Sequence, residues 1–252
     1  MDSAIQQYIR STVVRDRDVE RVGPFLATFD RTTDHPFLSY AIPDDGAEPT
    51  PGDVAALRAA YERRGRVPRL EYLPTRAPAA EAALLAGGFA VEARLALMTC
   101  VPDEVAAIGA PDGAELVLPD TDEQLRDGTA VANAAFGEPG VPSPATVARL
   151  RGRIAAGAIA VLARDAGSGR AIGWGVCSVP GDGATELAGI AVDEGRRRHG
   201  IAGAITARLA REAFARGVET AFLTPGDDAA GRVYARAGFA ARSRMLHLRV
   251  EH

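Results

Sequence analysis

The 252-residue sequence predicts an α/β protein in which mixed β-sheets are flanked by helices. Short apolar runs of strand length alternate along the chain with segments of helical periodicity, which is typical of this class. The same order of predicted elements also occurs twice, with an offset of 150 residues. Hydrophobic residues make up 47% and charged residues 25% of the chain, which is the ordinary balance of a globular protein.

The first half of the chain, residues 1–98, has the shorter set of elements. Strands are predicted at residues 22–29, 37–42, 70–73 and 91–98. Helices are predicted at residues 1–12, 50–64 and 77–86. Thr50-Pro51 marks the start of the middle helix, because threonine caps helices and proline fits their first turn. Residues 99–113 have proline and glycine near both ends and are predicted to be a linker.

The second half, residues 114–252, has the longer set. Strands are predicted at residues 114–118, 159–164, 171–179, 187–192, 221–223 and 242–250. Helices are predicted at residues 121–136 and 144–156, directly after Gly203, and after Asp227. The pair Thr121 and Gln124 resembles a capping box, which supports the first of these helices.

The two halves align without a gap at the 150-residue offset. The matched pairs include Ala41 and Ala191, Ile42 and Val192, Leu73 and Leu223, and Gly88-Phe89 and Gly238-Phe239. The hydrophobic register matches as well. The first half is therefore predicted to be a second, shortened copy of the same fold.

The most informative stretch lies between the strand that ends at Val192 and the helix that follows. It reads Asp193-Glu194-Gly195-Arg196-Arg197-Arg198-His199-Gly200-Ile201-Ala202-Gly203. The first N–H groups of a helix lack intrahelical partners and carry the positive end of its dipole. Small residues let a phosphate approach them, and arginines add charge-assisted hydrogen bonds. The stretch therefore predicts a phosphate site, although it contains neither a Walker loop nor a G-x-G-x-x-G fingerprint.

Arg197-x-x-Gly200-x-Ala202 closely resembles the Q/R-x-x-G-x-G/A loop of the GCN5-related N-acetyltransferase (GNAT) superfamily, which grips the pyrophosphate of acetyl-CoA. The segment from Asp227 to Phe239 looks like the family's N-x-x-A-x-x-x-Y-x-x-x-G-F, with Asp227 where asparagine is usual. The resemblance covers roughly residues 112–250. It implies a mostly antiparallel twisted sheet flanked by helices, with strands that splay apart at the cofactor site. Combined with the 150-residue repeat, it predicts two GNAT-like folds in tandem.

The resemblance implies acetyl-CoA as co-substrate, without a metal, and it assigns the binding residues. The pyrophosphate loop comprises Arg197, Arg198, His199, Gly200, Ile201, Ala202 and Gly203. The backbone of Ile190, Ala191 and Val192 is implied to pair with the pantetheine arm, and Asp227 and Ala230 to border the cofactor. Arg198 stands where the family often has glycine. The alternative is that the loop is only a solvated charged turn.

Two residues are candidates for the chemistry, in which the family's acceptor amine attacks the thioester directly. Tyr234 matches the tyrosine that protonates the departing thiolate; its alternative role is packing beside Gly238-Phe239. Glu186 is the only carboxylate within the predicted central strand and is the candidate base, often acting through water. Its alternative role is a salt bridge at a strand edge.

The first copy lacks these residues. The positions equivalent to Arg197, Gly200 and Ala202 are Ala47, Thr50 and Gly52, and the position equivalent to Tyr234 is Leu84. We therefore expect a degenerate first domain at residues 1–98 and a complete one at residues 114–252.

The remaining properties limit the partners and the compartment. A net charge of −4 points to neither nucleic acid nor an acidic membrane surface. Two cysteines are too few for a disulfide scaffold or a zinc site, and no run has membrane-spanning length, so a cytoplasmic protein is expected. The resemblance implies a small-molecule or peptide amine as acceptor. The sequence leaves the oligomeric state open, with a monomer as one option because a tandem mimics a dimer. A non-catalytic acyl-CoA-binding module, and transfer of a longer acyl group or to a non-amine acceptor, are the alternatives.

Overall fold

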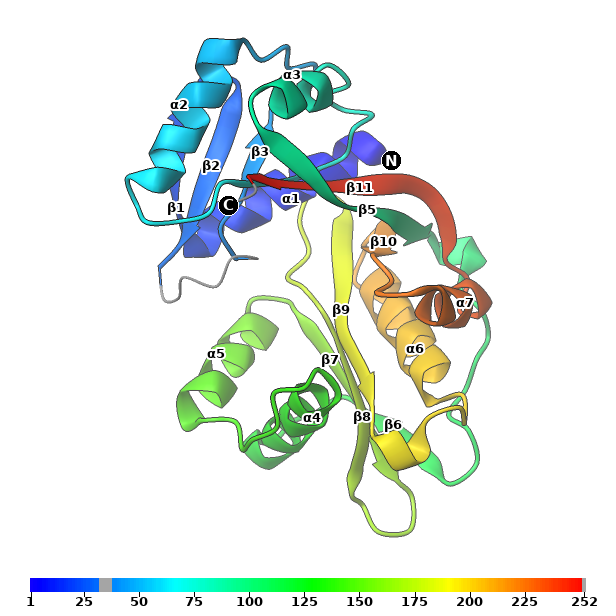
Figure 1. Ribbon diagram of the computed structural model, residues 1–252. Coiled ribbons are helices and arrows are strands. Elements are labelled where there is room, and N and C mark those ends of the chain that lie inside the picture. Colours follow the sequence, from blue (N-terminus) through cyan, green and yellow to red (C-terminus); the bar gives the residue numbers. More distant parts are fainter. Residues whose placement is uncertain (32–37, 251–252) are drawn as a thin grey trace. The chain divides into compact units, whose positions relative to one another are not determined.

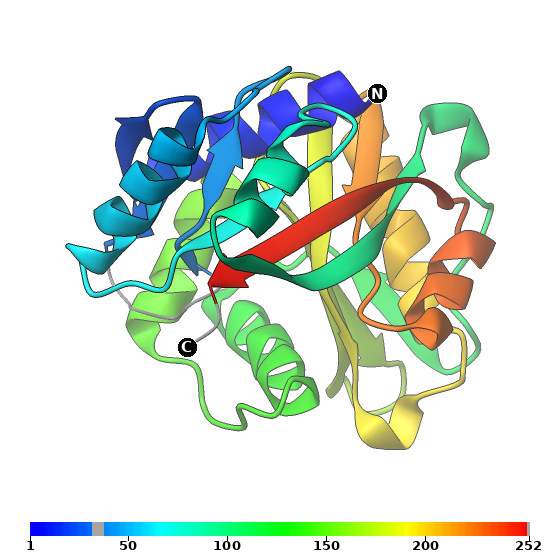
Figure 2. The same cartoon turned by 45° about the horizontal axis from the view of Figure 1, so that its top comes forward.

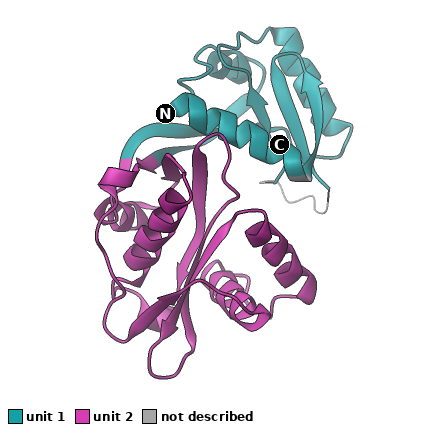
Figure 3. Ribbon diagram, turned by 180° about the vertical axis from the view of Figure 1, so that it is seen from behind, with its two compact units in different colours: residues 1–97, 241–252 teal, residues 98–240 magenta. Residues whose placement is uncertain are grey.

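Residues 1–31 and 38–250 are described by the structure, a computed structural model (Figure 1). The chain divides into one unit of residues 1–97 and 241–252 and a second of residues 98–240 (Figure 3). In each unit, helices pack against a β-sheet. No helix within the described residues has both the length and the apolar character needed to span a bilayer.

The first unit begins with a helix and a hairpin. Its elements are α1 (Asp2–Asp16), β1 (Arg17–Val22), β2 (Phe25–Asp30), β3 (Ala41–Pro43), α2 (Pro51–Glu62), β4 (Arg69–Tyr72), α3 (Ala80–Ala86), most of β5 (Phe89–Cys100) and nearly all of β11 (Ala240–Val250). Strands β1, β2 and β3 pair antiparallel in sequence. Strand β3 pairs in parallel with β4, and β4 pairs antiparallel with β11.

The second unit holds the longer set of elements. After the end of β5 come η2 (Pro102–Glu104), β6 (Ala114–Val117), α4 (Asp122–Ala135), α5 (Pro144–Ala155), β7 (Ile159–Asp165), β8 (Ala171–Cys177), β9 (Ala184–Val192), η3 (Glu194–Arg196), α6 (Ile201–Ala215), β10 (Thr220–Leu223) and α7 (Asp228–Arg236). Strands β6 to β9 pair antiparallel in sequence, β9 and β10 pair in parallel, and β10 pairs antiparallel with the end of β5.

Helices cover both faces of the sheet in the second unit. Side chains alternate between the two faces along each strand, so neighbouring residues pack in different clusters. Ile159, Val161 and Ala163 of β7 pack in the same core cluster as α6. Ala160 and Leu162, between them, pack with residues of α4 and α5. In Figure 2, α6 and α7 lie on one side of β9, and α4 and α5 lie on the other.

Strands β9 and β10 separate soon after they meet. They pair only over Ala184–Glu186 and Thr220–Phe222. Strand β9 continues to Val192, whereas the chain leaves β10 after Leu223. One edge of β9 beyond Glu186 therefore has no neighbouring strand among the described residues, which leaves its backbone groups facing a gap. A bulge, at which Gly189 has a φ of 61°, also bends β9 opposite β8.

The 150-residue offset is visible in the topology. Each unit has an antiparallel pair followed by a parallel pair with a helix between its strands, as β2-β3-α2-β4 and as β8-β9-α6-β10. The repeated Gly-Phe has a structural cause in both places. Gly88 and Gly238 have φ values of 86° and 106°, which favour glycine, and each stands directly after the C-cap residue of its helix, α3 or α7. Phe89 and Phe239 then enter the core.

The last strand differs from the prediction. Residues 242–250 do form a strand, β11, but it pairs with β4 in the first unit rather than closing the sheet of the second. In the second unit the position beside β10 is taken by residues 98–100 of β5. Thr99 and Cys100, which were predicted to begin the linker, therefore belong to a strand, and residues 105–113 contain no helix or strand.

The start of the chain is also more structured than predicted. The expected strand at residues 22–29 is a hairpin of β1 and β2, with a turn at Gly23, whose φ is 53°. Strand β1 lacks an apolar pattern because most of it is exposed or half-buried. Helix α1 extends to Asp16 rather than to residue 12. The strand predicted at residues 37–42 is β3 at Ala41–Pro43, and Phe37 lies outside the described residues.

Candidate functional site

Residues 193–200, here called the Arg/Gly loop, connect β9 to α6. No side chain caps the N-terminus of α6. Asp193 accepts a hydrogen bond from the backbone of Gly195 at 3.1 Å and shapes the turn. Gly200 is the N-cap of α6, with a φ of 81° and no side-chain hydrogen bond to the helix. By contrast, α4, α5 and α7 are each capped by a side chain, from Thr121, Ser143 and Asp227. The first N–H groups of α6 therefore remain available to an anionic ligand.

The loop also contains a strained residue. Arg198 has a φ of 66°, and Asp182 is the only other non-glycine residue with positive φ in the described part of the chain. The left-handed region costs a residue with a side chain about 1–2 kcal/mol. Arg198 therefore holds this shape against a backbone penalty, at a position where strain often accompanies function.

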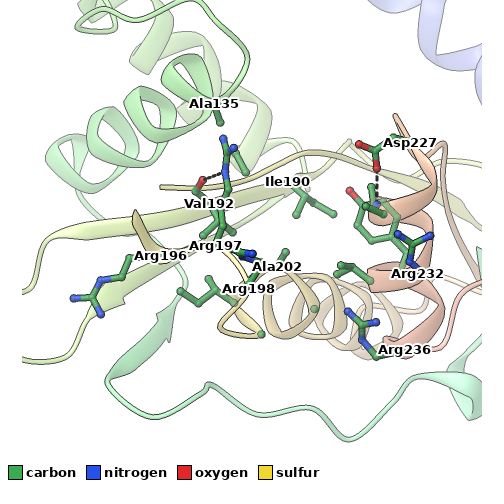
Figure 4. Close-up of a pocket in the computed structure, with 18 of the residues that line it drawn as sticks. Ala135, Ile190, Val192, Arg196, Arg197, Arg198, Ala202, Asp227, Arg232 and Arg236 are labelled. Carbon is green, nitrogen blue, oxygen red and sulfur yellow. Dashed lines mark hydrogen bonds between the residues drawn. The ribbon is translucent and has the colours of Figure 1, made fainter. Parts of the chain in front are cut away.

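A cavity of about 720 Å³ opens between this loop, the first turn of α6 and α7 (Figure 4). Its volume lies in the range of small-molecule and cofactor sites. The predicted residues that line it are Ile190, Ala191, Val192, Arg197, Arg198, Gly200, Ile201, Ala202, Gly203, Asp227, Ala230 and Tyr234. The structure thus brings together two motifs that are about thirty residues apart in sequence.

His199 and Glu186 do not line this cavity. The His199 ring is exposed, and its Nδ1 lies 2.8 Å from the backbone oxygen of Arg197. The predicted loop therefore contacts the cavity through the other residues, and His199 faces elsewhere. The cavity also has lining residues that the sequence motif does not mark, namely Ile108, Ala135, Phe136, Arg196, Ala229, Arg232, Val233 and Arg236.

The loop arginines differ in their surroundings. Arg196 forms an ion pair with Asp165, and the Nε of Arg197 donates to the backbone oxygen of Val192 at 3.4 Å. Figure 4 shows Arg197 turned back along β9, and Arg232 and Arg236 projecting from α7. The cavity is thus bordered by positive charge on two sides, which is the electrostatic setting of an anionic ligand.

A second cavity, of about 410 Å³, continues from the first into the gap between β9 and β10. Its walls are Phe136, Glu186, Leu187, Ala188, Gly189, Ile190, Leu223, Thr224, Gly226, Asp227, Ala230 and Tyr234. Five of these, Phe136, Ile190, Asp227, Ala230 and Tyr234, line both cavities. The half-buried Glu186 is the candidate base, and the structure places it in this second cavity.

Tyr234 lies where the two cavities meet. Its ring packs against the core of the second unit, and its side chain is half-buried. Burial raises the pKa of the Tyr234 phenol above its usual value near 10, and the nearby Asp227 carboxylate raises it further. The phenol is therefore protonated at neutral pH and is a potential proton donor in the cavity.

Asp227 has a structural role at the start of α7. Its Oδ1 accepts a hydrogen bond from the backbone of Ala230 at 2.7 Å and caps α7. The cap fixes the start of the helix that carries Tyr234. Aspartate at this position therefore keeps the cap that asparagine would provide and adds a negative charge to the lining of both cavities.

The two cysteines take no part in the site. Cys100 and Cys177 are both buried, and neither lines a cavity described above. Burial raises the pKa of the Cys177 thiol far above its ordinary value, so the reactive thiolate does not form at neutral pH. This arrangement fits a reaction that proceeds without an acyl-cysteine.

Residues 131–239 match the family model described as the Acetyltransferase (GNAT) family. The chain carries a GNAT acetyltransferase domain. The matched range contains β9, the Arg/Gly loop, α6 and Tyr234, and it ends at the Phe239 of the second motif. The protein is therefore an acyltransferase of the GNAT type.

Solved structures extend the similarity beyond the GNAT domain. A GCN5-related N-acetyltransferase from Kribbella flavida is similar over 100% of this chain and 96% of its own, with a TM-score of 0.84 and 26% identity. Another from Sphaerobacter thermophilus has a TM-score of 0.69 and 16% identity, covering 90% and 76% of the two chains. These neighbours confirm the predicted class, a mixed α/β fold with a twisted open sheet flanked by helices.

A tandem GNAT protein from the clavulanic acid biosynthesis pathway shares the fold at 14% identity, with a TM-score of 0.64 over 94% of this chain and 85% of that one. No curated protein matches the chain significantly in sequence.

Proposed function

We propose that the protein transfers the acetyl group of acetyl-CoA to a primary amine by direct attack. The observation that carries this proposal is the uncapped N-terminus of α6, which opens into the same cavity as the free edge of β9 and Tyr234. The N–H groups after Gly200 bind the pyrophosphate. On the edge of β9 that faces away from β8, backbone groups of residues 190–192 offer hydrogen bonds to the amide groups of the pantetheine arm.

The reaction needs two proton transfers, and the second cavity holds a group for each. Glu186, directly or through water, accepts a proton from the amine as its nitrogen attacks the thioester carbon. The carbon–sulfur bond then breaks, and the thiolate takes the proton of the Tyr234 phenol. The products are an acetamide and free CoA, and solvent returns the proton to Tyr234.

The acceptor side supports a cationic amine. Glu186 and Asp227 are carboxylates that line the second cavity, and no arginine, lysine or histidine is among its lining residues in the described chain. Carboxylates concentrate cations and disfavour anionic acceptors. The exposed ring of Phe136 adds an apolar wall at the junction of the cavities.

The first unit supports a tandem with one degenerate copy. Thr50 and Asp53 form a capping box at the start of α2, in which Asp53 accepts from the Thr50 backbone at 2.9 Å and donates its own N–H to Thr50 Oγ1 at 3.2 Å. The Thr50 hydroxyl also donates to the Asp53 carboxylate at 2.6 Å, and this bond together with the one from the Thr50 backbone N–H lowers the pKa of Asp53. The helix terminus that corresponds to the start of α6 is thus already occupied by a carboxylate, which would repel a phosphate.

The cofactor site is tested by calorimetry with Gly200→Glu. We expect wild-type protein to bind acetyl-CoA and the variant to bind it on the order of a hundredfold more weakly, because like charges brought together cost several kcal/mol. Gly200→Asn is the control, since asparagine tolerates the left-handed conformation without adding charge. Equal affinity of wild type and Gly200→Glu for acetyl-CoA would contradict the assignment of the pyrophosphate.

Turnover is tested separately, by following thiol release from acetyl-CoA with polyamines, aminoglycosides, amino acids and peptides as acceptors. We expect cationic acceptors without a carboxylate to react fastest. Tight binding of acetyl-CoA with no thiol release from any amine would favour the binding-module alternative.

A further inference from the structure

Helix α7 presents two arginines to the larger cavity that no motif accounts for. Arg232 and Arg236 both line it, and residues four apart in sequence lie on one face of a helix (Figure 4). Both side chains are exposed, so a ligand in the cavity can reach them.

The two guanidinium groups have no partner among the described residues. Neither forms a hydrogen bond or an ion pair with any described residue, whereas Arg196 in the same cavity is paired with Asp165. Like charges at this helical spacing repel each other and weaken the helix. Asp227 is the only carboxylate among the residues that line the cavity, and its Oδ1 caps α7. The helix dipole favours Arg236 in the last turn of α7, but it gives no reason for Arg232 on the same face. An anionic ligand would account for both arginines.

The arginines flank the point at which α7 approaches the pyrophosphate site. Val233 lies between them, and a Cβ placed on Gly203 would be 3.8 Å from its Cγ1. Gly203 belongs to the first turn of α6, whose free N–H groups are assigned to the pyrophosphate. The cavity thus has two positive regions side by side, one of backbone N–H groups and one of guanidinium groups.

CoA has matching chemistry, since it carries a diphosphate and, on the adenosine ribose, a separate 3′-phosphate. We propose that Arg232 and Arg236 bind this 3′-phosphate, so that the protein selects CoA esters over their 3′-dephospho analogues. This inference rests on the proposed function and adds a specificity determinant to it. Guanidinium groups suit the role because they bind phosphate through paired hydrogen bonds and never lose their charge.

The test compares two ligands by calorimetry, acetyl-CoA and acetyl-3′-dephospho-CoA, on the full chain. We expect wild type to prefer acetyl-CoA by roughly 10- to 100-fold, the range expected for hydrogen bonds to a charged group. Arg232→Gln/Arg236→Gln should bind both ligands equally, with its affinity for the dephospho ligand unchanged. The control Arg149→Gln/Arg216→Gln has the same net charge; it removes two exposed arginines outside both cavities and should retain the preference.

Three results would overturn the inference. Wild type without a preference would do so before any variant is made. So would a preference that persists in Arg232→Gln/Arg236→Gln, or an equal loss of affinity for both ligands. Failure of wild type to bind either ligand would instead overturn the proposed function on which the inference rests.

Discussion

Tyr234→Phe should lower kcat for acetyl transfer by about a hundredfold to ten-thousandfold, the range of general acid catalysis, while the affinity for acetyl-CoA stays within about twofold. The phenol borders both cavities and keeps its proton because burial raises its pKa. Phenylalanine retains the ring that packs in the core, so the loss should fall on the chemical step. Steady-state thiol release gives kcat, and calorimetry gives the dissociation constant.

The matched control for this variant is Tyr72→Phe. Tyr72 is a buried tyrosine of the first unit whose hydroxyl has no hydrogen-bond partner among the described residues. Removal of the Tyr72 hydroxyl should leave kcat for acetyl transfer unchanged. If Tyr234→Phe retains wild-type kcat as well, Tyr234 is a packing residue and the thiolate must obtain its proton elsewhere.

The pKa of Tyr234 also predicts the pH dependence. Because the pKa is raised, the protonated phenol persists to higher pH than it does in free tyrosine, and an acid catalyst is active in its protonated form. Ionisation of this group should therefore cause no loss of kcat below about pH 10. A fall in kcat at neutral to mildly alkaline pH that disappears in Tyr234→Phe would contradict the assignment.

The parts of the site that the sequence predicted are those fixed by local interactions. The caps at Thr50 and Thr121 are decided within a few residues of chain. The two GNAT motifs are likewise local, and the spacing of their residues carries over to the lining of one cavity. The predicted starts of α2, α4 and α5 accordingly agree with the observed ones to within one residue.

The parts that it missed depend on contacts between distant segments. Nothing near residues 242–250 indicates that β11 pairs with β4 rather than with β10, since either partner buries the same alternating pattern. Strand β1 was missed because an exposed strand rich in charge lacks the apolar signal. Arg232 and Arg236 stand at unspecified motif positions, and only their four-residue spacing on the helix of Tyr234 could have drawn attention to them.

Gly238→Ala should reduce the free energy of unfolding by at least about 4 kcal/mol, an exceptional value for one methyl group. Gly238 has a φ of 106°, and an added Cβ would lie 2.1 Å from the backbone oxygen of Glu104. A carbonyl cannot move aside as a flexible side chain can, because η2 and the hydrogen bond from Ala106 N to Ala237 O hold this backbone in place. The methyl group should therefore separate the end of α7 from the segment after β5.

Gly217→Ala isolates the steric part of that effect. Gly217 follows α6 in the same unit with a φ of 85°, but a Cβ there meets nothing within 4 Å. Gly217→Ala should lower the free energy of unfolding only by the cost of the left-handed conformation, about 1–2 kcal/mol. Urea unfolding followed by the fluorescence of Trp174, which is 3% exposed in the core of this unit, measures both variants. Equal losses in the two variants would show that strain alone explains the glycine, and that the Gly-Phe motif does not depend on its contact with Glu104.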